Sequence, residues 1–159
     1  MRSIVRKLGA AALALSAAGT ALAQLEPFTL PAGVACDFPL TFQPLAPGHQ
    51  QIRITDQQGR TGTAIFAGQF GTLQVINAAT GESLTLPGKG AVNITRDNGD
   101  GTQTITLAGH WVVVWFPTDN PAGPSTIEYV GQVVIRQAGT VSTLVSLKGK
   151  QVLDICAAL

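Results

Sequence analysis

The sequence predicts an all-β fold, a single domain of antiparallel strands. Apolar and polar residues alternate over short segments, and clusters of Gly, Pro, Asn and Asp separate these segments. After the N-terminal 23 residues, no window of about eleven residues shows helical periodicity. Because short connections join successive strands, we expect each strand to lie antiparallel to the one before it, in meander order.

The segment 109–116 is expected to be the central strand, because it carries no polar side chain from Trp111 onward and contains both tryptophans. Such a run cannot be a strand with one wet face, so we expect it to be covered on both sides. One face should carry Trp111, Val113 and Trp115, and the other Val112, Val114 and Phe116.

Residues 1–23 are predicted to be a signal peptide. Three basic residues precede the apolar stretch 8–18, which is too short for a membrane anchor, and residues 21–23 fit the small-x-small rule for cleavage after Ala23. No later segment is long and apolar enough for a transmembrane helix. We therefore expect a secreted, extracellular protein.

The charge of the chain argues against nucleic acid as a partner. Three of the ten basic residues lie in the predicted signal peptide, which leaves seven basic residues against nine acidic ones and no basic cluster. Nucleic-acid binding needs a dense positive surface.

The two cysteines, Cys36 and Cys156, are expected to form one disulfide, with no free thiol, because an exported chain reaches a compartment in which disulfides persist. A loop of this length is worth about 4 to 5 kcal/mol in the chain-entropy model. A redox-active pair is the alternative, but the pair has no CxxC spacing.

Segment 24–48 contains five prolines and is predicted to be an extended arm without a central strand. The β domain should follow at 49–159. Its expected strands cover 50–56, 63–68, 72–77, 83–86, 91–95, 102–107, 109–116, 126–137, 140–148 and 151–156. Segment 63–77 could instead be one strongly bent strand, because Gly68 and Gly71 lie within it.

These nine or ten strands fit either a barrel with lipocalin-like closure or a two-sheet sandwich. We favour the barrel, because a glycine-bent strand and cysteines near both ends of the chain suit closure.

Candidate ligand-binding residues lie on and around the central strand. They are His110, Trp111, Trp115, Asp119 and Tyr129. The aromatic side chains could line an apolar cavity or fill a solid core. His110 could be a site residue, with Asp119 or Glu128 as its acid–base partner, or a strand-end histidine bonded to backbone.

Other site types have little support in the sequence. The loop 117–125 could form the rim of a pocket or protect a sheet edge. The acidic turn 97–101 is explained by a hairpin and lacks the ligand pattern of a calcium loop. We expect no metal, no cofactor and no catalytic residue, since a Ser125, His110 and Asp119 triad lacks a nucleophile elbow.

The last half of the chain, 81–159, resembles a family of secreted β-rich proteins of unknown function from high-GC Gram-positive bacteria. The resemblance implies export, a single β domain and a bond between Cys36 and Cys156, but no activity or site residue. It is carried by Asp100-Gly101-Thr102-Gln103-Thr104, Gly109-His110, Phe116-Pro117-Thr118-Asp119, Pro121-Ala122-Gly123-Pro124-Ser125-Thr126, Tyr129-Val130-Gly131 and Asp154-Ile155-Cys156-Ala157-Ala158-Leu159.

The sequence thus favours a secreted, non-enzymatic protein that binds a small apolar ligand or an extracellular protein. A structural or protein-interaction module of the cell envelope is the alternative. An enzyme with a sparse site near His110 and the 117–125 loop is the third hypothesis. The sequence leaves the oligomeric state open.

Overall fold

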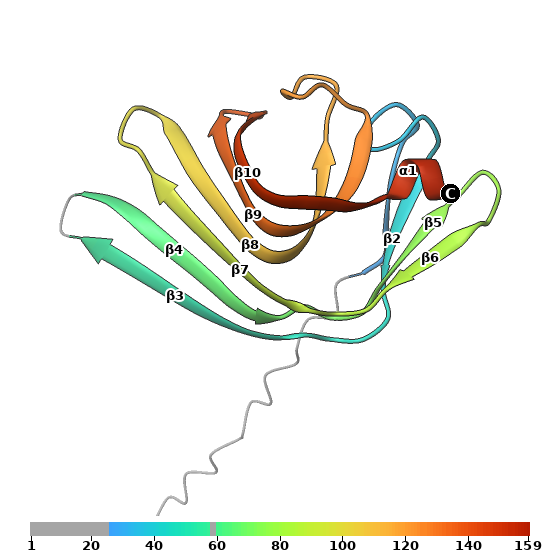
Figure 1. Cartoon of the computed structure of the whole chain (residues 1–159), viewed down its shortest axis with the longest axis horizontal. Helices are drawn as coiled ribbons and strands as arrows, with labels where there is room; N and C mark the ends of the chain where they lie inside the picture. Colours follow the sequence, from blue (N-terminus) through green and yellow to red (C-terminus); the bar gives the residue numbers. More distant parts are fainter. Residues whose placement is uncertain (1–25, 58–59) are drawn as a thin grey trace, which may run out of the picture.

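The computed structural model describes residues 26–57 and 60–159 and contains two antiparallel sheets and one short helix (Figure 1). The small sheet has the order β1-β2-β5-β6, and the large sheet has the order β10-β9-β8-β7-β4-β3. The small sheet comprises β1 (Phe28–Leu30), β2 (Leu40–Pro44), β5 (Leu73–Asn77) and β6 (Ser83–Leu86). The large sheet comprises β3 (His49–Gln57), β4 (Arg60–Gln69), β7 (Gly90–Asp97), β8 (Thr102–Trp115), β9 (Ser125–Ala138) and β10 (Val141–Asp154), and helix α1 (Ile155–Ala158) follows it.

The all-β class and the antiparallel pairing are confirmed, but the predicted barrel closure is not. Within the described ranges the strands pair in two sheets, and no closed barrel forms. The order also departs from a simple meander, since β2 pairs with β5 and β4 pairs with β7. The predicted signal peptide, 1–23, lies outside the described residues.

A row of glycines bends the large sheet. Gly68, Gly109, Gly131 and Gly149 lie in register, with Ala91 between the first two. Gly109 has φ +96° and Gly131 has φ +118°, and a Cβ at either residue would lie 2.4 or 2.5 Å from a carbonyl oxygen of the neighbouring strand. Only glycine allows this conformation and this close approach. We call this row, residues 68, 109, 131 and 149, the glycine crease.

The crease divides the large sheet into two walls. Strands β3, β4 and β7 begin or end beside it, whereas β8, β9 and β10 continue past it and turn upward (Figure 1). Leu107 and Val133, before the turn in β8 and after it in β9, belong to one apolar cluster with Trp115 and Tyr129 from the other wall. The folded sheet therefore encloses a core of its own.

The second core lies between the outer face of β8 and the small sheet. Val112 and Val114 pack against a cluster that includes Leu40, Phe42 and Val75 of the small sheet. Trp111, Val113 and Trp115 belong to the first core. The prediction that the central strand is covered on both faces is confirmed, and its residues face the two sides as expected.

The prolines of segment 24–48 do not prevent a central strand, which corrects the predicted arm. In the described part of this segment, β2 pairs with β1 on one side and with β5 on the other. Pro39 precedes β2 and Pro44 is its last residue, so neither proline removes a donor from the middle of the ladder. The segment is part of the small sheet and of its core.

Four predicted strands merge into two long ones. The predicted segments 102–107 and 109–116 merge into β8, and the predicted segments 140–148 and 151–156 merge into β10. Residues 155 and 156 belong to helix α1 instead. The glycines read as breaks, Gly109 and Gly149, lie inside these strands because glycine lets a strand turn without ending. The final helix α1 was not predicted. Asp154 caps it by accepting from Ala157 N at 3.1 Å.

The predicted disulfide between Cys36 and Cys156 is confirmed and joins the turn after β1 to α1 across 120 residues. The Cys36 residue is fully buried in the second core with Ile155. The hydroxyl of Thr126 on β9 donates to Ala35 O at 3.0 Å beside it. The bond therefore fixes both ends of the described chain to the outer face of the large sheet.

Strand β10 is an edge strand whose free edge is partly covered. Asn120 N donates to Ser142 O at 2.8 Å, and Leu144 N donates to Asn120 O at 2.7 Å. Two register shifts interrupt the strand, where Val145 and Val152 are extra residues and are exposed. Bulges, lysines and a covering loop are usual means of preventing edge-to-edge association. This arrangement supports the reading of loop 117–125 as edge protection.

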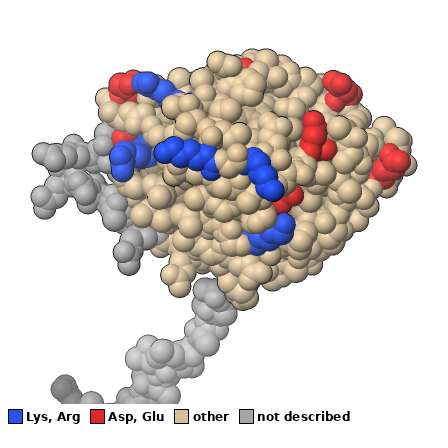
Figure 2. All heavy atoms as spheres, in the orientation of Figure 1, with Lys and Arg blue, Asp and Glu red and all other residues tan. Residues whose placement is uncertain are grey.

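Charged side chains are sparse on the face shown in Figure 2, where most of the surface is formed by uncharged residues. No described helix is long and apolar enough to cross a membrane.

We predict that Gly131→Ala lowers the free energy of unfolding by at least about 2 kcal/mol, because the new Cβ meets the Lys148 carbonyl at a positive φ. Gly90→Ala is the control, since a Cβ there meets nothing within 4 Å. It should be neutral or slightly stabilising. Urea denaturation of both variants measures this, and equal stabilities would contradict the role of the crease.

Removal of the disulfide in a Cys36→Ala/Cys156→Ala variant should lower the free energy of unfolding by about 2 to 5 kcal/mol, because the unfolded chain gains freedom. Thermal denaturation of this variant and of the reduced wild type should agree. A variant as stable as the oxidised wild type would show that the bond adds nothing to stability.

Candidate functional site

A pocket of about 840 Å³ lies between the small sheet and the outer face of β8 and β9. Val112, Val114 and Phe116 form one wall, since alternate residues of β8 point to this side. The opposite wall is made by the small sheet, through Phe28, Leu30, Phe42, Leu73 and Leu86. Residues 44–48 and 70–72 also line the pocket.

Aromatic contacts hold both sides of the pocket. The rings of Phe28 and Phe42 stack with centroids 5.1 Å apart, and Phe70 meets Trp111 edge to face at 4.6 Å. The Trp111 indole donates to Ala108 O at 3.1 Å, which fixes the ring. These side chains therefore contribute to a mainly apolar lining.

Three polar residues lie together in this apolar lining. Glu128 Oε1 is 3.3 Å from His110 Nδ1 and 3.7 Å from Lys89 Nζ. The Glu128 side chain is 14 % exposed, against 31 % for His110 and 41 % for Lys89. We call these residues the polar triad of the pocket.

The fold brings the triad together from three separate segments. His110 follows the crease on β8, and Glu128 lies on β9 two residues from Val130, the partner of His110. Such diagonal neighbours are within reach of long side chains. Lys89 precedes β7, and its carbonyl accepts from Phe70 N at 3.2 Å. Gly88 allows this contact, because a Cβ there would collide with Phe70 O.

Of the five candidate ligand-binding residues, the structure places His110 and Trp111 in the pocket lining. Trp115 and Tyr129 lie in the first core, each 1 % exposed, where the Trp115 indole donates to the Tyr129 hydroxyl at 3.1 Å. Both tryptophans pack in the first core, but only Trp111 also lines the pocket.

Asp119 has a structural position away from the described pocket lining. Its carboxylate accepts from Phe116 N at 2.8 Å and from Ser142 N at 2.7 Å. It therefore holds the loop between β8 and β9 onto the edge of β10. The loop itself contributes no residue to the described pocket lining beyond Phe116, which precedes it.

Sequence reasoning did not identify Lys89 or the small-sheet wall as parts of a site. Glu128 was considered only as a possible partner of His110. Lys89 stands in a Pro- and Gly-rich turn, and nothing in the chain indicates that this turn lies against Phe70. The pairing register and the return of β5 to β2 were needed to find them.

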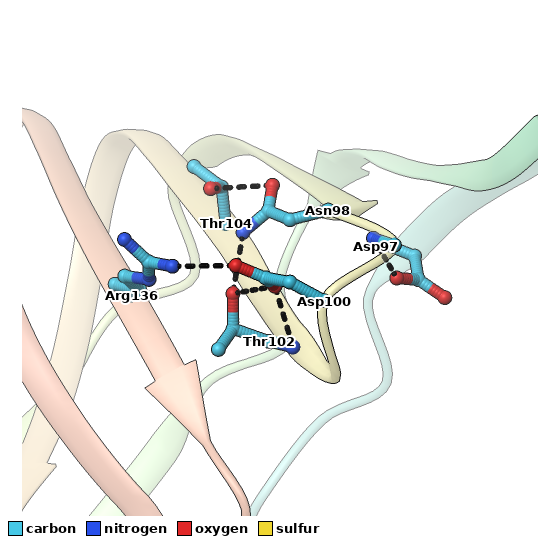
Figure 3. A network of polar contacts seen from close by, with 7 residues as sticks. Asp97, Asn98, Asp100, Thr102, Thr104 and Arg136 are labelled. Carbon is cyan, nitrogen blue, oxygen red and sulfur yellow. Dashed lines mark hydrogen bonds and ion pairs between the residues drawn. The ribbon is translucent and has the colours of Figure 1, made fainter.

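A second polar cluster lies at the hairpin turn between β7 and β8 (Figure 3). Thr102 donates to Asp100 Oδ1 through its hydroxyl at 2.6 Å and its backbone N–H at 3.0 Å, and Arg136 donates to Oδ2 at 2.8 Å. These contacts, the Thr102 side chain foremost, hold the pKa of Asp100 below its ordinary value. The cluster is fully accounted for by turn and cross-strand bonds.

The described residues contain no group of three or more His, Cys, Asp or Glu side chains that could hold a metal ion. No family model, curated protein or solved structure matched this chain.

We predict that carbon-detected NMR titration gives Asp100 a pKa below its ordinary value, and that Thr102→Val raises it by removal of the hydroxyl donor. Because the folded pKa is depressed, any stabilisation from Asp100 is present above about pH 4 and is lost as the pH falls through the folded pKa. An unchanged pKa in Thr102→Val would contradict this assignment.

Proposed function

We propose that this protein is a non-enzymatic binding protein that holds a small, largely apolar ligand between its two sheets. The observation that carries the proposal is the pocket of about 840 Å³ with apolar walls and one group of polar side chains. Ligand pockets commonly have volumes of about 300 to 1,000 Å³ and just this composition. The walls belong to paired strands and include the stacked rings of Phe28 and Phe42.

We also propose that the protein acts outside the cell, after removal of the predicted signal peptide at Ala23. The disulfide supports this proposal, since such bonds persist mainly in oxidising compartments. Membership of the family of secreted β-rich proteins remains part of the proposal.

A protein-interaction module is the second candidate, and the exposed apolar residues of β10 favour it. Val145 is 59 % exposed, and Val141, Leu147 and Val152 are also exposed. However, Val145 and Val152 stand at bulges, and Lys148 and Lys150 lie between them. These features discourage strand pairing more than they favour it, so we rank this candidate below ligand binding.

An acid–base enzyme is the third candidate, favoured by the contact of His110 with Glu128 in a pocket. The described lining otherwise offers one hydroxyl, that of Thr72, and no thiol. We rank this candidate last because so few groups could act on a substrate.

The proposal predicts that N-phenylnaphthylamine, a neutral apolar dye, binds with increased fluorescence. Trp111→Ala should weaken this binding severalfold, because the indole lines the pocket and contacts Phe70. The measurement is the emission of the dye on titration with the wild type and with the folded variant. Equal affinities of the two proteins would place the ligand elsewhere.

A matched pair of variants locates the dye further. Leu45 lines the pocket and is 50 % exposed, whereas Val145 is 59 % exposed and outside the described lining. Leu45→Asp should lower the affinity for the dye about tenfold or more, because it places a charge against an apolar ligand. Val145→Asp should leave the affinity unchanged. Equal effects, or no dye binding to the wild type, would refute the proposed function.

A further inference from the structure

Glu128 determines the hydrogen-bonding state of His110 in the polar triad. Its Oε1 lies 3.3 Å from His110 Nδ1. An ionised carboxylate can only accept hydrogen bonds. When the imidazole is neutral, the proton is therefore held on Nδ1, which donates to Glu128, and Nε2 is left as an acceptor.

The Nε2 atom is available to a ligand. Over the part of the chain that the structure describes, His110 forms a hydrogen bond only through Nδ1. The side chain lines the pocket and is 31 % exposed. A neutral His110 thus presents a hydrogen-bond acceptor within a mainly apolar lining.

Lys89 supplies the complementary donor. Its ammonium has three N–H groups, and the contact with Glu128 at 3.7 Å leaves donors for a ligand. Lys89 Nζ and His110 Nδ1 lie 3.7 Å and 3.3 Å from the same Glu128 oxygen, so the two side chains are neighbours in the pocket lining. A ligand that uses both side chains must contact Lys89 Nζ and His110 Nε2 with one small group.

The charges of the triad favour an uncharged ligand group. The formal charges of Lys89 and Glu128 cancel, and Glu26, the remaining acid of the described lining, is exposed at the start of the described chain. A ligand carboxylate would meet the lone pair of Nε2 and the carboxylate of Glu128. A quaternary ammonium would lie beside the positive charge of Lys89 and can neither donate nor accept a hydrogen bond.

We infer, on the basis of the proposed function, that the ligand is an uncharged apolar alcohol whose hydroxyl group lies at the triad. The hydroxyl oxygen accepts from Lys89, and the hydroxyl proton is donated to His110 Nε2. The apolar body of the ligand lies along Val112, Val114 and the facing residues of the small sheet.

Two probes of matched apolar body test this inference. Decanol can accept from Lys89 and donate to His110, whereas decyl methyl ether can only accept. Competition against N-phenylnaphthylamine, at about pH 8 where imidazoles are ordinarily neutral, gives both affinities. Decanol should bind about fivefold to tenfold more tightly than the ether, the effect of one hydrogen bond.

Variants assign this preference to the triad. His110→Ala should reduce the preference for decanol over the ether to about onefold, and His49→Ala, which changes the other histidine of the chain, should keep it. Lys89→Met should weaken both probes about equally, because both use the ammonium donor. Circular dichroism verifies that each variant folds.

The outcomes separate this inference from the proposed function. If the dye and both probes fail to bind the wild type, the proposed function is wrong. If the dye binds and the wild type shows equal affinity for decanol and the ether, only the alcohol inference is overturned. A preference that survives in folded His110→Ala overturns it as well, and the wild-type comparison decides alone if this variant does not fold.

Discussion

Gly109 and Gly131 face each other across β8 and β9, and the neighbouring strands pass so close to both that a Cβ would collide with a carbonyl oxygen. This close approach lets the large sheet fold on itself with its hydrogen-bond ladder continuous on both sides of the crease. Sheets that curve this sharply need glycine at defined positions. The bend gives the large sheet a concave face that encloses one core and an outer face that supports a second.

The pocket is a consequence of that geometry. The pairing of β7 with β8 ends at Gly109, so His110 and Trp111 have no β7 residue beside them. The small sheet packs against the outer face of β8, and the pocket lies beside this contact, lined by Phe28 and Leu73 on one side and by Val112 and Val114 on the other. The disulfide, and the hydrogen bond from Thr126 to Ala35 O, tie the segment between β1 and β2 to the outer face of the large sheet. Under the proposed function, the polar triad orients a ligand that the apolar walls retain.

Much of the fold could be predicted from local pattern. Alternation located the strands from β3 onward to within a few residues but missed β1 and β2, and the apolar run at 111–116 correctly indicated a strand covered on both faces. The prediction of strand bounds failed at glycines and prolines, because each can either end a strand or lie within it. Gly109 and Gly149 end strands in many sequences but here allow them to bend, and Pro39 and Pro44 looked incompatible with a central strand but stand at its ends. The candidate site was likewise predicted only in part. His110 and Trp111 were found because they belong to the central strand, whereas Lys89 enters the site only through contacts between segments far apart in the chain.

The most direct test of the account is native mass spectrometry of the protein recovered from the organism that encodes it. We expect a fraction of the protein to carry a small uncharged molecule with an apolar body, lost on denaturation and recoverable for identification. The same preparation of Leu45→Asp should carry less of it, since Leu45 lines the pocket. Wild-type protein that is always free of such a molecule, or an equal load on Leu45→Asp, would contradict a ligand site between the two sheets.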